Sequence, residues 1–424
     1  MNVMQLFGPV LALLARILMA FAFAFFVPLA WAWFADDVAL RAVWAASFGL
    51  AFGSGWVLLL LTRRYSRELL PRDGFLLVNL VWLVLTVYAM VPLLFVVPDI
   101  TVSKAFFEAM SALTATGATA LSGLDSLPVS VNVWRCFLQL VGGLGIVLLV
   151  VAVLPLLGLG GMQLYKAETP GPMKDAKLTP RIAETARGLW AVYFVLSVAC
   201  FLAYRWAGMS WADAFMHMCT TMGLGGLSSH DASFGYWNSP AIEWVATLFM
   251  TLAGISFLRY FMVWRSRSFK PVTDDREIRM YIVVLLVATL MVFISLLDHQ
   301  PQSHAADTLR TALFHVVSVA TTTGYASQDY TQWPVALPVL MMFLGAFASC
   351  AGSTGGGIKM VRMVLLIKQA RRELVRIIHP RVVNPVTLGG QTVPPAVMQA
   401  VLGFMLIYGG ATMGLTFLML LSGL

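Results

Sequence analysis

The sequence is poor in charge and in cysteine. Only 11% of its 424 residues are charged, whereas 59% are hydrophobic. The four cysteines lie apart in apolar stretches without metal-ligand spacing, so we interpret them as buried free thiols. No Ser/His/Asp arrangement, paired carboxylates or zinc spacing stands out, which argues against an intramembrane enzyme. The cysteines are Cys136, Cys200, Cys219 and Cys350.

Long apolar runs recur from end to end and predict an all-α polytopic membrane protein. The first run, from Phe7 to Phe34, lacks a basic start and a clear small-residue cleavage site, which favours a retained helix over a signal peptide. The predicted spans are roughly residues 8–34, 42–61, 75–97, 134–158, 189–206, 241–264, 280–297, 337–358 and 395–421.

The formal net charge of +8 is unevenly distributed. Four connections, 62–74, 162–188, 259–279 and 359–381, hold 22 of the 28 lysines and arginines. Basic loops remain in the cytoplasm, so this distribution predicts a cytoplasmic N-terminus and argues against nucleic acid as the partner. We assign Arg41, Lys104, Arg135, Arg205 and Arg310 to connections on the outside, and Arg16 to the first span.

Three of the outside connections contain short semi-apolar helices. They read SKAFFEAMSALTATGAT from Ser103, SWADAFMHMCTTMGLGGLS from Ser210 and SHAADTLRTALFHVVSVATTTGYAS from Ser303. A helix of about 12–15 residues is too short to cross the hydrocarbon core. Each is expected to start near its serine, and Ser210 with Asp213 resembles a capping box.

The three segments align on one glycine each, namely Gly117, Gly226 and Gly324, at intervals of 109 and 98 residues. Such a weak internal repeat is typical of transporters and channels built from duplicated units. Nine residues before each glycine stand Glu108, His217 and His315, and six residues before stand Ser111, Thr220 and Ser318.

A short helix followed by glycine suits a cation pathway. Irregular backbone at membrane depth persists only where protein buries it or where it lines a water-filled cavity. The helix end carries partial negative charge, glycine permits a sharp turn, and the following carbonyls can replace the water shell of a cation. Glycine and threonine are also common at helix–helix contacts, but three matched occurrences favour the pathway.

Several long motifs resemble the membrane subunit of a Trk-type potassium uptake system, in the Trk/Ktr/HKT superfamily. The motifs are FFEAMSALTATGATALSGLDSLP (106–128), GGLGIVLLVVAVLPLLGLGGMQLYKAETPGP (142–172), KLTPRIAETA (177–186), GLGGLSSHDASFGY (223–236), ATTTGYAS (320–327) and CAGSTGGGIK (350–359).

The resemblance implies helix–pore loop–helix repeats around a central pathway, preceded by two extra helices. The implied units are 1–74 (two helices), 75–188, 189–279 and 280–390 (three pore repeats) and 391–424 (the first helix of a fourth). The implied potassium filter consists of Ala115, Thr116, Gly117 and Ala118; Leu224, Gly225, Gly226 and Leu227; and Thr322, Thr323, Gly324 and Tyr325.

The resemblance also implies a homodimer in the bacterial inner membrane, regulated by a cytoplasmic nucleotide-binding ring subunit (TrkA-like), with potassium as cargo and no bound cofactor.

One departure from the family pattern stands out. A further interval from Gly324 predicts a fourth glycine at 422–433, whereas the sequence stops at Leu424. We therefore expect the last pore repeat to be missing and one side of the filter to be open.

The glycine-rich stretch AGSTGGGIK (351–359) interrupts a long apolar segment. It lacks the Lys-Ser/Thr ending and the preceding strand of a phosphate-binding loop. By the resemblance it is a flexible gate beneath the filter, and the alternative is a kink that only shapes packing. The implied gate residues are Gly352, Ser353, Thr354, Gly355, Gly356, Gly357 and Lys359.

Other polar residues leave alternatives open. Glu108, His217 and His315 share one register, so bracing of the pore helices is favoured over a metal site formed by the two histidines. Asp125 and Asp231 either concentrate cations at the outer mouth or are simply solvated. The basic run KQARRELVR (368–376) contacts either anionic lipid or the ring subunit.

Two other functions compete with a potassium pore. A proton- or sodium-coupled secondary carrier should have ionisable groups at mid-membrane, and the predicted spans contain few, chiefly Arg16. A non-conducting membrane scaffold would follow from the missing repeat.

Overall fold

The chain folds almost entirely into helices, as predicted. The computed structural model describes residues 3–35, 37–65, 70–152, 178–299, 304–388 and 391–423. The helices of the first half are α1 (Val3–Ala22), η1 (Phe23–Phe25), α2 (Phe26–Phe34), α3 (Val38–Thr62), α4 (Pro71–Val96), α5 (Val102–Leu113), η2 (Leu124–Ser126), α6 (Val129–Ala152) and α8 (Leu178–Trp206).

The second half continues the helical pattern, and the strands described are one short antiparallel pair. Its elements are α9 (Trp211–Gly223), η4 (Ser233–Tyr236), α10 (Pro240–Ala253), α11 (Phe257–Ser266), α12 (Lys270–Thr273), α13 (Arg276–His299), α14 (Ala305–Ala320), η5 (Tyr330–Gln332), α15 (Ala336–Gly345), α16 (Met360–Ile378), β1 (Thr387–Leu388), β2 (Gln391–Thr392) and α17 (Pro395–Leu421).

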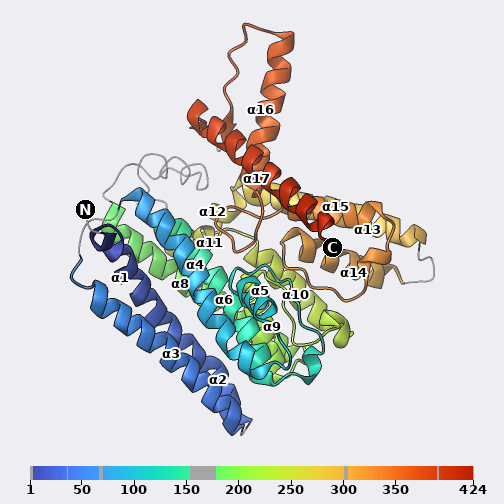
Figure 1. Ribbon diagram of the computed structural model, residues 1–424. Coiled ribbons are helices and arrows are strands. Elements are labelled where there is room, and N and C mark those ends of the chain that lie inside the picture. Colours follow the sequence, from blue (N-terminus) through green and yellow to red (C-terminus); the bar gives the residue numbers. More distant parts are fainter. Residues whose placement is uncertain are drawn as a thin grey trace.

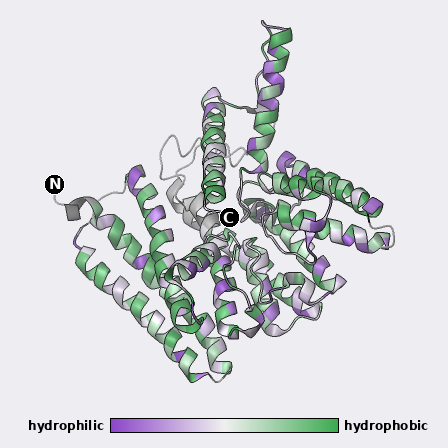
Figure 2. Cartoon of the chain, turned by 45° about the vertical axis from the view of Figure 1, so that its right-hand side comes forward, coloured by the Kyte–Doolittle hydropathy of each residue, from purple (hydrophilic) through white to green (hydrophobic). Residues whose placement is uncertain are grey.

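Many of these helices suit a bilayer. Six described helices are long and apolar enough to span it, and α10 with α11 makes a seventh if this pair, bent by 83°, counts as one span. Hydrophobic residues predominate along the long helices (Figure 2). Large apolar side chains such as Leu286 and Phe417 face outward, where a lipid environment removes the cost of their exposure to water.

The short helices α5 and α9 lie near the centre of the view, and α14 lies to their right beside α13 (Figure 1). Helix α5 packs against α4 and α6, α9 packs between α6 and α8, and α14 packs against α10 and α13. At the N-terminal side, α1 lies along α3. Helix α16 projects away from the rest of the bundle (Figure 1).

Two predicted spans are wrong as continuous helices. The span predicted at 241–264 breaks between α10 and α11, and the span predicted at 337–358 is helical only as far as Gly345. The reason is that the two interruptions bond each other. The Cys350 N–H donates to the Gly254 carbonyl at 3.0 Å, and the Phe257 N–H donates to the Gly352 carbonyl at 3.1 Å.

The start of α6 also differs from the prediction. The helix begins at Val129, five residues before the predicted span at 134–158, so Arg135 lies within the helix and not in an outside connection. Residues 153–177, which include the end of that span, lie outside the described residues.

Candidate functional site

The three predicted short helices are present as α5, α9 and α14, with 12, 13 and 16 residues. Their starts differ from the prediction in two cases. The hydroxyl of Thr101, not of Ser103, caps α5, and α14 starts after His304 without a side-chain cap. The predicted cap of α9 is confirmed, because the Ser210 hydroxyl accepts from the Asp213 N–H at 3.0 Å.

The same backbone turn follows each helix. Two residues before each aligned glycine stands a non-glycine residue with positive φ, namely Ala115 (54°), Leu224 (52°) and Thr322 (65°). The glycines themselves have φ of 79°, 73° and 88°. Left-handed backbone is costly for residues with a side chain and clusters at functional sites. This threefold recurrence therefore indicates a shared, built turn.

The turn is held by one recurring hydrogen bond. The N–H of the residue before each glycine donates to the carbonyl six residues before the glycine, at 2.8–3.0 Å in all three segments. The pairs are Thr116 with Ser111, Gly225 with Thr220, and Thr323 with Ser318. The chain thus turns back on the end of its own helix at equivalent positions.

The three turns meet one another. A Cβ added to Gly117 would lie 1.7 Å from the Gly225 carbonyl oxygen, and a Cβ added to Gly226 would lie 1.8 Å from the Thr323 carbonyl oxygen. A Cβ at Gly324 would meet no described atom within 4 Å. The first turn therefore packs against the second, and the second against the third, while the Cβ position of Gly324 faces no described atom.

Hydroxyl groups six residues before the glycines brace two of the turns. The Ser111 hydroxyl donates to the Ala118 carbonyl at 2.6 Å, and the Ser318 hydroxyl donates to the Tyr325 carbonyl at 2.7 Å. Thr220 differs, because its hydroxyl bonds the Tyr325 hydroxyl. The buried Tyr325 side chain thus joins the third turn to the second helix.

The side chains nine residues before the glycines all contact the segment just after their own glycine. The Glu108 carboxylate accepts from the Ala120 N–H at 3.0 Å. The His217 Nε2 lies 3.0 Å from the Ser228 hydroxyl, and the His315 Nε2 accepts from the Ser327 N–H at 3.3 Å. Within the described residues, no group of three or more His, Cys, Asp and Glu side chains could hold a metal ion.

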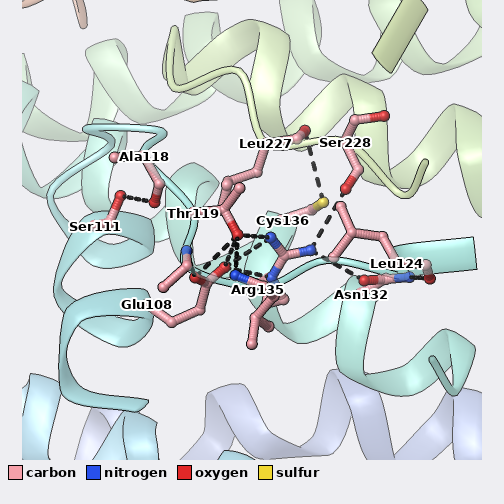
Figure 3. A network of polar contacts seen from close by, with 12 residues as sticks. Glu108, Ser111, Ala118, Thr119, Leu124, Asn132, Arg135, Cys136, Leu227 and Ser228 are labelled. Carbon is pink, nitrogen blue, oxygen red and sulfur yellow. Dashed lines mark hydrogen bonds and ion pairs between the residues drawn. The ribbon is translucent and has the colours of Figure 1, made fainter. Parts of the chain in front are cut away.

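Sequence reasoning missed a polar face of α6 that supports the first two turns (Figure 3). Arg135, fully buried, forms an ion pair with Glu108 at 2.7 Å and donates to the Thr119 hydroxyl at 3.1 Å. Asn132 donates to the Leu124 carbonyl at 2.8 Å. The signal was present as three polar residues at helical spacing in an apolar helix, the third being Gln139.

Gln139 contacts the second turn directly. Its side-chain amide nitrogen donates to the Gly225 carbonyl at 2.9 Å, and its amide oxygen accepts from the Leu227 N–H at 3.2 Å. A buried amide with both groups paired fixes the backbone at both positions.

The glycine-rich segment lies against the ends of the second and third short helices. The Thr354 hydroxyl donates to the Met222 carbonyl at 2.9 Å, and the Gly356 N–H donates to the Thr322 hydroxyl at 2.9 Å. A Cβ at Gly355 would lie 3.0 Å from the Thr321 carbonyl oxygen. The segment therefore contacts the same two turns on the side of the helix ends.

The remaining residues of this segment stabilise its own path. The Ser353 hydroxyl donates to the Cys350 carbonyl at 2.7 Å, and the Lys359 ammonium bonds the Gly355 carbonyl. Gly352, Gly357 and Lys359 have positive φ of 77°, 81° and 75°. At Gly357 a Cβ would lie 2.5 Å from the Ala346 carbonyl oxygen.

Acidic residues after the turns connect loops of different segments. His230 Nδ1 bonds the Asp125 carboxylate, and this hydrogen bond holds the pKa of the Asp125 carboxyl below its ordinary value. The Asp231 carboxylate accepts from the Leu124 N–H at 3.1 Å. The two carboxylates are therefore engaged in linking the segments after the first and second turns, which neither sequence interpretation anticipated.

Comparisons with known proteins agree with this architecture. The family model TrkH, described as cation transport protein, matches residues 43–417. The Trk system potassium uptake protein TrkH of Salmonella typhimurium is 45% identical over 363 residues, which are 85% of this chain and 75% of that protein. Its counterpart in Halomonas elongata is 42% identical, over 94% of this chain and 83% of that protein.

A solved structure is similar as well. The crystal structure of the potassium transporter TrkH from Vibrio parahaemolyticus matches with a TM-score of 0.86 and 37% identity, covering 96% of this chain and 84% of that one. These matches confirm the family indicated by the sequence motifs and the polytopic helical fold. The chain belongs to the TrkH family of cation transport proteins.

Proposed function

We propose that this chain forms the pathway by which potassium ions cross the bacterial inner membrane, as the pore subunit of a Trk-type uptake system. The observation that carries the proposal is the meeting of three equivalent turns at Gly117, Gly226 and Gly324, each after a half-length helix. Backbone carbonyls grouped in this way can replace the hydration shell of a monovalent cation. The relatives named as potassium uptake proteins supply the choice of ion.

The proposed filter comprises the four residues at each turn, whose carbonyls select the ion without a bound cofactor. Glu108, His217 and His315 would hold each filter strand from behind, which their hydrogen bonds to the following segments support. No chemical step is catalysed. We further propose a cytoplasmic N-terminus, a homodimer and regulation by a cytoplasmic nucleotide-binding ring subunit.

The proposed translocation is tested by uptake of potassium or rubidium into liposomes. Because a Cβ at Gly324 would meet no described atom within 4 Å, the assay compares this chain with a version extended with a fourth helix–loop–helix repeat. We expect potassium and rubidium to enter faster than sodium in the extended form. Failure of the extended form to carry potassium would show that the assignment is wrong.

The proposed gate is the segment Gly352–Gly357. Replacing Thr354 with valine keeps the side-chain shape and removes the hydrogen bond to the Met222 carbonyl. A buried hydrogen bond contributes about 1 kcal/mol, so we expect potassium flux to rise several-fold. The matched control is Thr412→Val, because among the described residues that exposed hydroxyl bonds the Tyr408 carbonyl of its own helix α17. Equal flux through the two variants would argue for a kink without a gating role.

A further inference from the structure

We infer that Glu277, at the start of α13, anchors the gate segment and holds it in the position that closes the pathway. This inference rests on the gate proposed above and extends it to a residue outside the segment. The Glu277 Oε1 atom accepts two backbone hydrogen bonds, from the Ala351 N–H at 2.7 Å and from the Val361 N–H at 3.2 Å. These two donors flank the segment on either side, so one carboxylate oxygen ties its two ends together.

The surroundings of Glu277 make this contact strong. Glu277 is only 9% exposed, although it carries an ionisable side chain. A buried backbone N–H that loses its acceptor costs the full desolvation penalty of that group. The Ala351 and Val361 N–H groups therefore depend on this side chain for their pairing.

The anchor lies at the base of the gate, apart from its tip. The tip bonds the turns through Thr354 and Gly356. At the base, the Met360 N–H donates to the Ser349 carbonyl at 2.8 Å, which closes the segment into a narrow loop. Glu277 fixes this loop to a different helix, so its loss should loosen the segment without removing the hydrogen-bonding groups of the tip or of the filter.

Glu277 also connects the gate to α11. The Asp275 carboxylate accepts from the Glu277 N–H at 2.7 Å, and the same carboxylate forms an ion pair with Arg259 of α11. The first residue of α11, Phe257, donates to the Gly352 carbonyl at 3.1 Å. Helix α11 therefore bonds the gate directly at Gly352 and is linked to it indirectly through Asp275 and Glu277, so a displacement of α11 would be transmitted to the segment.

The test compares potassium flux in liposomes for Glu277→Ala, Glu277→Asp and Glu277→Gln in the extended form. Alanine removes the acceptor and aspartate withdraws it by one methylene, so both variants should raise flux about tenfold or more, because two buried backbone hydrogen bonds are lost. Glutamine keeps an acceptor oxygen and should stay closest to the unsubstituted protein. The control is Asp298→Ala, an exposed acidic residue near the other end of α13, which should leave flux unchanged.

A second measurement follows the gate directly. Cys350 is buried at the base of the segment, and its thiol should react faster with a water-soluble maleimide when the anchor is lost. Cys350→Ala identifies this signal among the four cysteines. If Glu277→Ala does not fold, Glu277→Asp replaces it in both the flux and the labelling measurements. Unchanged flux and unchanged labelling in a folded aspartate variant would overturn the inference.

Deletion of Gly352–Gly357 separates this inference from the function on which it rests. If the deletion raises flux and the Glu277 variants do not, the anchor is wrong and the gate stands. If the deletion also leaves flux unchanged, the gate and the anchor are both wrong. Loss of potassium transport by the unsubstituted extended protein would overturn the proposed function itself.

Discussion

Replacing Gly226 with alanine is expected to abolish potassium flux, because the new methyl group would lie 1.8 Å from the Thr323 carbonyl oxygen. Non-bonded contacts of Cβ under 3.0 Å are essentially never seen, and the obstacle here is backbone that cannot rotate away. The glycine also has φ of 73°, where a side chain adds about 1–2 kcal/mol of strain. The neighbouring strands must therefore separate. Gly117→Ala should act in the same way against the Gly225 carbonyl.

The matched control for this substitution is Gly403→Ala in α17, because no described atom lies within 4 Å of the added methyl group there. This change should preserve flux, because alanine stabilises a helix by about 1 kcal/mol relative to glycine. Rubidium uptake into liposomes measures all the variants, with size-exclusion chromatography to show that each is folded. Normal uptake by a folded Gly226→Ala protein would contradict a filter at this position.

Much of this site could be predicted from sequence because its parts recur. A half-length helix, a glycine and a polar residue nine positions earlier form a repeated pattern, and the pattern holds even where the residue changes from Glu108 to His217. The structure gives a physical reason for that tolerance. A carboxylate and an imidazole both reach the segment just after the glycine and pair there with a backbone N–H or a hydroxyl.

Other contacts could not be predicted because they join segments far apart in the chain. Gln139 bonds Gly225 across 86 positions, and Thr354 bonds Met222 across 132. Arg135 was misplaced for a related reason. Charge counting treats a basic residue near a span as a loop residue, but its partner Glu108 makes a buried position tolerable. Local periodicity identifies a helix face and does not identify what that face touches.

Replacing Arg135 with methionine is expected to destabilise the protein by about 3–5 kcal/mol, because Glu108 would then keep a buried carboxylate without its cationic partner. The guanidinium also donates to the Thr119 hydroxyl and to the Asn132 side-chain oxygen, at 3.1 and 3.0 Å. Methionine fills a similar volume but gives neither oxygen a donor, and Thr119 keeps its bonds to Leu121 and Glu108. The measurement is the thermal unfolding midpoint of the purified protein in detergent.

Two further variants separate the ion pair from general effects of the substitution. Arg376→Met removes an arginine whose partner Glu373 lies 3.6 Å away on exposed α16, and such a surface pair contributes less than about 1 kcal/mol. The double variant Arg135→Met with Glu108→Gln removes the buried charge and keeps an oxygen to accept from the Ala120 N–H. It should therefore unfold at a higher temperature than Arg135→Met alone. If Arg135→Met instead unfolded at the same temperature as Arg376→Met, the buried ion pair between Arg135 and Glu108 would stabilise the protein no more than a surface pair does. The first filter strand would then need another support.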